Sequence, residues 1–320
     1  MEKNNGLDSK FNELLNVFSK DDTLISNGYP NYDLFALKTE LKNKWNIFNF
    51  HTDTDIHRFL ESLLKNNYPK KLELLNGQVG IFEFINDDYM EKNSILKGKS
   101  WDEFLIHIKH EIRFHSNYVN YDVLKYFLSL LTDTIHDVDY YRARNSNGEV
   151  LTKDEMSAPP KEKATAGRAN AEGVSHLYLG NDTLTAISEI QPNKSDEVYV
   201  GRFPIRKELK VIDFRLVNNI DVFEMQEVTK FAINIDILNE MITAISKPIS
   251  SIDTKLDYLP TQFIVDFIKS LGLQNEERYD GIIFDSTLGD GHNLMLFEPD
   301  TIECIDLEKR YIQSLLYTHS

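Results

Sequence analysis

The spacing of apolar residues changes near residue 137, and this change divides the sequence into two parts that must fold differently. Before it, apolar side chains recur every three or four residues, which places them on one face of an α-helix. The pattern is clear at residues 56–64 and 123–131, and between them at Trp101, Phe104, Leu105, Ile108 and Ile112. We therefore predict a helical domain over residues 1–136.

After this point the sequence contains short runs typical of β-strands. Gly, Asn and Asp turn signals separate these runs, which are SHLYLG, LKVIDF, GIIFDS and NLMLF. A helical segment, PTQFIVDFIKSLG, stands among them, with Pro260 suited to a first turn and Gly272 to a C-terminal cap. Strands and helices mixed without regular βαβ spacing predict an α+β domain over residues 137–320.

The charge balance excludes some classes of partner. The chain has 51 Asp and Glu against 35 Lys and Arg, a formal net charge of -16, and it has no basic tract. Phosphate contacts need clustered cations, so we expect no nucleic-acid partner. The one cysteine, Cys304, excludes an internal disulfide. The start lacks a secretory signal and no apolar run approaches the roughly 18 residues of a membrane span, so we expect a cytoplasmic protein without membrane contact.

The stretch GRANAEGVSHLYLGNDTLTAISEI, residues 167–190, places several chemically useful side chains close together. If SHLYLG is a strand, its two leucines point into the core and Tyr178 points to the other side. Asn181 or Asp182 would cap the helix that follows, on which Glu189 lies. Tyr178 and Glu189 can then face one cleft. A solvated helix glutamate and an ordinary strand tyrosine remain open as alternatives.

Arginines stand out in this acidic chain. Arg168 lies among small residues, and Gly167 beside it allows close approach of the backbone. The run YYRAR adds Arg142 and Arg144. A guanidinium in an uncrowded loop can bind an anion through two hydrogen bonds. Pairing with the chain's own carboxylates is equally open for each arginine.

The run YDGIIFDSTLGDGHNLMLF, residues 279–297, predicts two strands on either side of a glycine-rich turn. Ser286 ends the first strand and Asn293 begins the return strand. A plain hairpin, in which both side chains only satisfy turn hydrogen bonds, is the alternative. Because no G-x-S-x-G elbow surrounds Ser286, we do not expect a serine hydrolase.

Two stretches contain several histidines, which are common metal ligands, but the spacing of these residues is not that of a metal-binding site. HTDTDIH, residues 51–57, is better explained as the start of a helix capped by Asp53 or Thr54. The three histidines of residues 107–115 lack the H-E-x-x-H pattern. We therefore expect no metal site.

Four motifs, taken together and in order from about Tyr140 to Phe297, resemble the RES domain family. They are YYRAR, GRANAEGVSHLYL, TAISEI and FDSTLGDGHNLMLF. MSAPPKEKATAGRANAEG and LPTQF look like the branch with a helical N-terminal domain of the HEPN/RES type. The resemblance implies a fold similar to the ADP-ribosyltransferases, with NAD as substrate and no cofactor. It also implies service as a toxin held by a cognate antitoxin.

The family's motif positions fall on Arg142, Arg168, Tyr178, Glu189 and Ser286. The resemblance implies that the two arginines clamp the pyrophosphate, Tyr178 stacks on the nicotinamide, Glu189 acts on the ribose 2-hydroxyl, and Ser286 positions the nicotinamide or the ribose. Arg144 and Asn293, from the same motifs, join the substrate-binding candidates. Many family members carry an aromatic residue where this chain has Ala169.

Other functions compete with NAD cleavage by water or phosphate. An ADP-ribosyltransferase that modifies a protein would use the same site, and a non-catalytic interaction module would need none of this chemistry. An RNase in the helical half is disfavoured, because HEPN-type RNases place a His four to six residues after an Arg and here His115 follows Arg113 by two. The nucleophile, the antitoxin and the oligomeric state, a homo-oligomer included, stay open.

Overall fold

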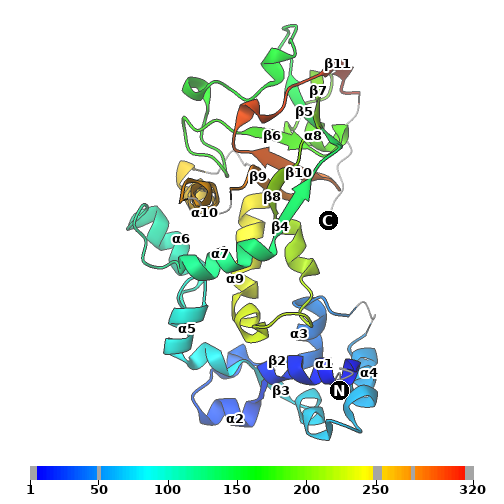
Figure 1. Ribbon diagram of the computed structural model, residues 1–320, viewed down its shortest axis with the longest axis vertical. Coiled ribbons are helices and arrows are strands. Elements are labelled where there is room, and N and C mark those ends of the chain that lie inside the picture. The colour runs from blue at the N-terminus through cyan, green and yellow to red at the C-terminus, as the bar shows by residue number, and fades with distance from the viewer. Residues whose placement is uncertain (1–5, 49–51, 248–253, 275–277, 314–320) are drawn as a thin grey trace. The chain divides into compact units, whose positions relative to one another are not determined.

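The computed structural model describes residues 6–48, 52–247, 254–274 and 278–313, and the predicted α+β class is confirmed (Figure 1). The chain divides into two compact units, and each unit is assembled from separate segments. The first comprises Met1–Trp101, Asn117–Leu124 and Asn218–Asn239. The second comprises Asp102–Ser116, Lys125–Val217 and Glu240–Ser320.

The first unit is mainly helical, as the sequence predicts. Its helices include α1 (Leu7–Leu14), α2 (Asp21–Ser26), α3 (Leu37–Asn43), α4 (Asp53–Leu64) and α5 (Asp87–Asn93). It also holds a small antiparallel sheet of β1 (Ser19–Lys20), β3 (Gln78–Gly80) and β2 (Phe35–Ala36), in that order. Strands of two or three residues have no alternation long enough to detect, which is why the periodicity did not predict them.

Helix α4 shows both the strength and the limit of the periodicity. Ile56, Leu60 and Leu64 are buried on one face, as predicted. The expected cap at Asp53 or Thr54 is wrong by one or two residues. Thr52 has an extended backbone and its side chain accepts a hydrogen bond from the Asp55 backbone, so it is the N-cap.

The second unit is built on an eight-stranded sheet of order β11-β7-β5-β6-β10-β9-β8-β4. Neighbouring strands are antiparallel except β8 and β9, which are parallel. The strands are β4 (Thr132–Ile135), β5 (Val138–Asn145), β6 (Leu177–Gly180), β7 (Glu197–Ile205), β8 (Leu209–Asp213), β9 (Gly281–Asp285), β10 (His292–Leu296) and β11 (Asp306–Tyr311). Strand β4 corrects the helical expectation for residues 132–135.

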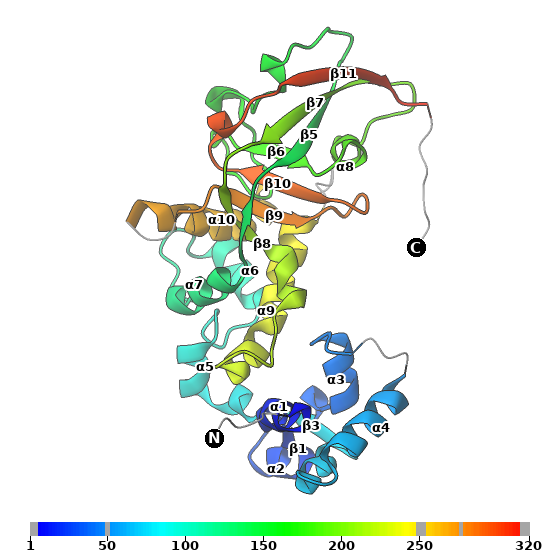
Figure 2. The same ribbon diagram turned by 45° about the vertical axis from the view of Figure 1, so that its right-hand side comes forward.

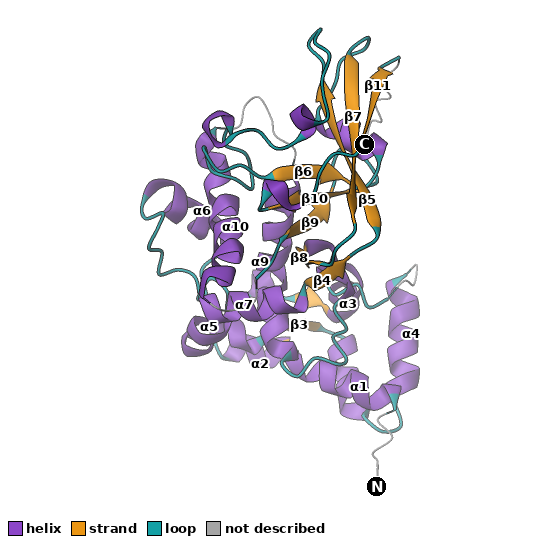
Figure 3. Ribbon diagram, turned by 45° about the horizontal axis from the view of Figure 1, so that its top comes forward, coloured by secondary structure: helices purple, strands orange, loops and turns teal. Residues whose placement is uncertain are grey.

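The remaining longer helices are α6 (Trp101–His110), α7 (Tyr121–Leu130), α8 (Thr183–Glu189), α9 (Val228–Ser246) and α10 (Leu259–Leu271). Helix α10 has a proline in its first turn and Gly272 as its C-cap, as predicted. It packs on α6 through Phe263 and Phe104, whose ring centres are 5.8 Å apart (Figure 3). Ile112, predicted on the buried stripe of α6, is 47% exposed, because the helix ends before it.

Within the described part of the chain, none of the helices combines the length and the apolar character that a bilayer crossing needs. Helix α9, with 19 residues, is long enough but not sufficiently apolar.

The core of the second unit lies against one face of the sheet. Leu177 and Leu179 of β6 are buried in it together with Phe203, Ile283 and Leu294 from neighbouring strands. The two leucines therefore point into the core, as the alternation of SHLYLG predicts. Tyr178, between them, faces the other way.

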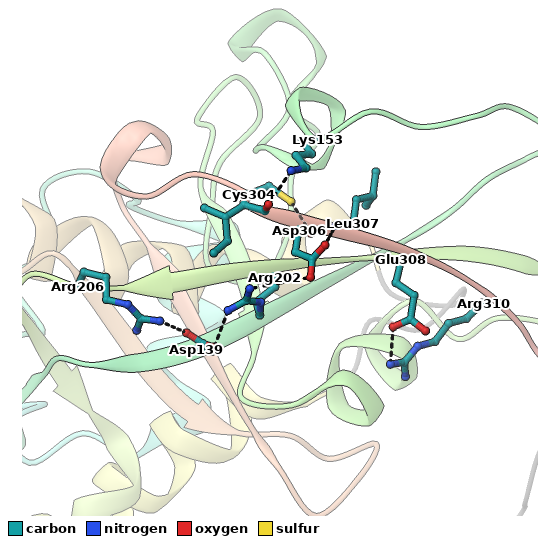
Figure 4. Close-up of polar contacts among 10 residues, drawn as sticks. Asp139, Lys153, Arg202, Arg206, Cys304, Asp306, Leu307, Glu308 and Arg310 are labelled. Atoms are coloured by element: carbon teal, nitrogen blue, oxygen red, sulfur yellow. Dashed lines mark hydrogen bonds and ion pairs between the residues drawn. The ribbon is translucent and has the colours of Figure 1, made fainter.

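Charged side chains tie the outer strands β5, β7 and β11 to one another (Figure 4). Asp139 pairs with Arg202 at 3.1 Å and with Arg206 at 2.8 Å, and Arg202 also lies 3.9 Å from Asp306. Beside them the Cys304 thiol donates to the Asp306 carbonyl at 3.1 Å. Each such partly exposed pair contributes about 1 kcal/mol or less, so the backbone ladder sets the register here.

Candidate active site

The candidate site lies where the large sheet splays apart. Strands β5 and β6 pair at a single position, Tyr141 opposite Gly180, and then diverge (Figure 2). A cavity of about 370 Å³ opens between them. Its walls come from both strands, the loop 164–170, helix α8 and the end of α9 at Ile245–Lys247. Segments far apart in the sequence therefore meet around one space in the second unit.

Helix α8 places Glu189 at this cavity. Of the two residues expected as its cap, Asn181 and Asp182, the structure selects Asp182, whose carboxylate accepts a hydrogen bond from the Thr185 backbone at 2.8 Å. One face of the helix, including Ala186, packs on Ala143 of β5 and Val200 of β7. That packing fixes the rotation of the helix, so Glu189, its last residue, projects to the cavity and stays exposed to solvent.

Two donors hold the Glu189 carboxylate in one orientation. The Ser286 hydroxyl and the Asn293 side-chain amide each donate to its Oε1 atom at 2.7 Å. Both donors are buried, and the Leu288 backbone donates to the Ser286 hydroxyl at 3.2 Å. Because both bonds from these side chains go to Oε1, the other oxygen, Oε2, can accept a bond from a ligand.

Arg142 of β5 brings a positive charge to the cavity wall. Its Nη1 atom donates to the carbonyls of Met156 at 3.1 Å and Ser157 at 2.6 Å. Burial, with a smaller effect from Arg144, lowers the pKa of Arg142 to about 10, so it remains cationic at neutral pH. The two carbonyls carry no formal charge and do not neutralise the Arg142 guanidinium. Its positive charge can therefore attract an anion in the cavity.

Arg168 is buried in the loop that covers the cavity, with its guanidinium 5.3 Å from the centre of the Tyr258 ring. The first turn of α10 holds this loop. The Thr261 hydroxyl donates to the Arg168 carbonyl, and the Gln262 amide donates to the Gly167 carbonyl at 2.8 Å. The LPTQF motif therefore supports the arginine loop, a role that its sequence did not reveal.

Tyr178 and Asn170 form the next part of the wall. The Tyr178 hydroxyl donates to the Asn170 side-chain oxygen at 2.9 Å, and burial raises the pKa of Tyr178. The Asn170 amide in turn donates to the Thr165 and Val174 carbonyls at 2.9 and 3.1 Å. A Cβ atom at Gly167 would lie 2.8 Å from the Asn170 oxygen, so only glycine leaves this bond undisturbed. Sequence reasoning overlooked Asn170, although it lies two residues after Arg168.

The cavity brings together five of the seven predicted site residues: Arg142, Arg168, Tyr178, Glu189 and Asn293. Ser286 is not among the lining residues, and its hydroxyl donates to the Glu189 carboxylate, which is. Arg144 is not among the lining residues. It is exposed further along β5, and its guanidinium donates to the Glu155 carbonyl.

Across the residues that the structure describes, no group of three or more His, Cys, Asp or Glu side chains is arranged to hold a metal ion. His51, from one of the two stretches considered above, lies outside the described residues. His107, from the other, is buried and its Nδ1 atom lies 2.7 Å from the Glu111 carboxylate.

Comparison with known families gives one result. A family model described as RES domain matches residues 139–315, which include β5 after Val138, strands β6 to β11 and all seven predicted site residues. No curated protein and no solved structure matches the chain significantly.

Proposed function

Because the chain belongs to the RES domain family, we propose that it cleaves the bond between nicotinamide and ribose in NAD. The family is generally one of NAD-related enzymes. The observation that carries the proposal is the Glu189 carboxylate, which two buried donors fix at a cavity that also holds two arginines.

In the proposed step, the bond between ribose C1′ and the nicotinamide nitrogen breaks and its electron pair goes to the nicotinamide. The ribose acquires oxocarbenium character, which a carboxylate hydrogen-bonded to the 2-hydroxyl stabilises. Glu189 can accept that bond at Oε2, since Ser286 and Asn293 occupy Oε1. Water or phosphate then bonds to C1′ and loses its proton to solvent. The products are nicotinamide and ADP-ribose or its 1-phosphate.

The other lining residues fit the rest of the substrate. The Tyr178 ring can stack on the cationic nicotinamide, a contact worth about 0.5 to 2 kcal/mol. Arg142 and Arg168 can bind the pyrophosphate. The net charge of -16 does not prevent this, because exposed charges are largely screened beyond about 8 Å and the nearby arginines dominate.

The test is to incubate the purified protein with NAD, with and without phosphate, and to identify the products by mass spectrometry. Nicotinamide with ADP-ribose indicates hydrolysis, and a phosphate-dependent 1-phosphate indicates phosphorolysis. An ADP-ribose adduct on a protein would instead assign the site to a transferase. Unchanged NAD under all conditions would contradict NAD cleavage.

We expect the activity to be independent of metal ions, since the proposed step uses only a carboxylate, two arginines and an aromatic ring. NAD turnover should be the same before and after treatment with EDTA and desalting. Loss of activity that an added divalent ion restores would contradict the proposed site. Thermal melting of the treated protein provides the control for unfolding.

Ser286→Ala should lower kcat for NAD by about tenfold to a hundredfold with little change in KM, because a hydrogen bond to a charged group contributes about 1.5–3 kcal/mol. We infer that Ser286 is a positioning residue, since it contacts Glu189 and does not line the cavity. Steady-state kinetics separates the two constants. Ser129→Ala, which removes a hydroxyl bonded to the Tyr126 carbonyl, is the matched control. An unchanged kcat would show that Asn293 alone orients the carboxylate.

We further propose a toxin-type role with a cognate inhibitory protein, because unrestrained NAD cleavage would harm the cell that makes the enzyme. Expression of the wild type should lower cellular NAD and arrest growth, and expression of Glu189→Gln should do neither. Equal arrest by both would show that growth inhibition has another cause. We also propose that the helical part of the chain, the HEPN/RES-type segment of the resemblance, serves regulation or assembly.

A further inference from the structure

Strand β10 begins at His292, whose imidazole ring contacts two polar side chains outside the cavity. The Arg215 guanidinium lies 2.9 Å from the ring Nδ1 atom, and the Tyr140 hydroxyl lies 3.0 Å from Nε2. Arg215 in turn pairs with the Asp213 carboxylate at 2.6 Å. These four residues, which we call the His292 network, are not among those that line the cavity, so the proposed cleavage does not use them.

The contact with Arg215 fixes the protonation state of the ring. A guanidinium has only N–H donors, so Nδ1 of His292 must accept and carries no proton. The proton of the neutral ring then lies on Nε2, which donates to the Tyr140 hydroxyl. Burial raises the pKa of Tyr140 to about 12, so the phenol stays neutral. A protonated ring would direct Nδ1–H at an Arg215 N–H, and this contact would be lost.

The groups around the ring decide which partner moves on protonation. Burial and, after it, the charge of Arg215 lower the pKa of His292, against the opposite effect of three carboxylates, those of Asp213, Asp285 and Asp182. The Asp213 carboxylate is 1% exposed and accepts bonds from Nε and Nη2 of Arg215 at 2.9 and 2.6 Å. These two bonds hold the guanidinium in place. The His292 ring is therefore the group that must move.

The backbone on either side of His292 is tied to both donors that hold Glu189. The next residue, Asn293, donates its side-chain amide to Glu189 Oε1. The preceding residue, Gly291, accepts a bond from the Ser286 backbone at 2.9 Å, and the Ser286 hydroxyl is the second donor to Glu189. Successive side chains of a strand point to opposite faces, so the His292 ring and the Asn293 amide lie on opposite faces of the sheet. A displacement of His292 therefore shifts both donors.

A second contact limits that displacement. The His292 backbone N–H donates to the Asn181 side-chain oxygen at 2.8 Å, and the Asn181 backbone donates to the His292 carbonyl at 2.9 Å. These bonds do not involve the imidazole and remain when it is protonated. We therefore expect a shift of the start of β10 and not its detachment from the sheet.

We propose that His292 is a positioning residue: its neutral ring, held between Arg215 and Tyr140, fixes the start of β10 and with it the two donors to Glu189, and protonation of the ring loosens them. The proposal rests on the proposed function only where NAD turnover is the readout. The clamp on Glu189 is complete at pH values above the pKa of His292 and is lost as the pH falls through it.

The first measurement is kcat for NAD as a function of pH in the wild type, His292→Leu and His292→Asn. Leucine offers Arg215 no acceptor, so kcat at pH 7 should fall on the order of tenfold with little change in KM. This is less than the hundredfold cost of a misplacement of about 1 Å, because Asn181 still holds the backbone. Asparagine supplies an oxygen near the position of Nδ1 and does not titrate. It should restore most of kcat and remove the decline that begins below about pH 6.5.

His136→Asn is the matched control, because His136 is exposed and lies 3.6 Å from the Asp137 carboxylate, away from the cavity residues. It should keep the pH profile of the wild type. A decline caused by protonation of Glu189 would persist in His292→Asn, so this variant separates the two causes.

The second measurement needs no NAD turnover. Nitrogen-15 NMR of the imidazole reports which ring nitrogen carries the proton, and the Asn293 side-chain amide signal reports its bond to Glu189. We expect Nε2–H at pH 7 and an Asn293 signal that changes with the titration of His292. Thermal melting of each variant checks folding, and if His292→Leu does not fold, His292→Asn and the NMR titration decide.

An Nδ1–H tautomer at pH 7, or an Asn293 signal that does not follow the titration of His292, overturns the proposal. Wild-type kcat in a folded His292→Leu, or an unaltered acid decline in His292→Asn, overturns it as well. If the protein leaves NAD intact while both NMR results are as expected, the positioning role of His292 stands and the proposed NAD cleavage is rejected. The two ideas can therefore fail separately.

Discussion

Glu189→Gln is expected to lower kcat for NAD cleavage about a hundredfold to a thousandfold while KM changes little. Glutamine keeps a side-chain oxygen that can still accept the bonds from Ser286 and Asn293, so the geometry at Oε1 is retained. The amide has no negative charge to offer the oxocarbenium-like ribose. An interaction that strengthens in the transition state is therefore lost, and substrate binding is largely spared.

Steady-state kinetics with NAD and thermal melting of both proteins check this expectation. Glu308→Gln is a matched control, because that exposed glutamate pairs with Arg310 on the outer strand β11 and not with any cavity residue. If Glu189→Gln turns over NAD at close to the wild-type rate, Glu189 has no catalytic role and is an ordinary solvated helix residue.

Gly180→Ala is expected to lower kcat by up to about a hundredfold in a protein that still folds. A Cβ atom at Gly180 would lie 2.7 Å from the Ala186 backbone nitrogen and 3.2 Å from the Thr185 carbonyl carbon. Both atoms belong to the backbone of α8, so the helix itself must shift, and Glu189 moves with it. A misplacement of about 1 Å can cost about a hundredfold in rate, whereas overpacking costs about 1–3 kcal/mol in stability.

Kinetics and denaturant unfolding of the same samples separate these two effects. The control is Gly289→Ala in the turn between β9 and β10, where the nearest atom to an added Cβ is the Ser188 hydroxyl at 4.0 Å. Wild-type kcat in Gly180→Ala would show that α8 tolerates the shift and that the position of Glu189 is not set by its contact with β6.

Much of the local structure around the site could be predicted from the sequence. Alternation in SHLYLG placed the leucines in the core and Tyr178 opposite them, and the helix after Asp182 followed from its cap. The hairpin of β9 and β10 followed from two apolar runs and a glycine-rich turn. These features depend on neighbours within a few residues, so spacing and turn chemistry are sufficient to predict them.

Other features could not be read from spacing. Arg142 and Arg144 are two residues apart on one strand, yet only Arg142 lines the cavity. Residues 218–239 belong to the first compact unit although they lie in the sequence between segments of the second. In the sequence Asn170 and Thr261 are ordinary polar residues. Their roles follow only from tertiary contacts, in which Asn170 accepts from Tyr178 and Thr261 donates to the Arg168 carbonyl.

The sequence by itself determined the elements with a clear apolar period, such as α4, α10, β6 and the hairpin of β9 and β10, and which of their faces is polar, because these depend on local periodicity and backbone preferences. Only the tertiary structure decided that Ser286 and Asn293 share one oxygen of Glu189, and that this carboxylate lines the same cavity as Arg142 and Arg168. The physical reason is the single pairing of β5 with β6, at Tyr141 and Gly180. Where these strands diverge depends on long-range packing of the whole sheet, which no short stretch of sequence encodes.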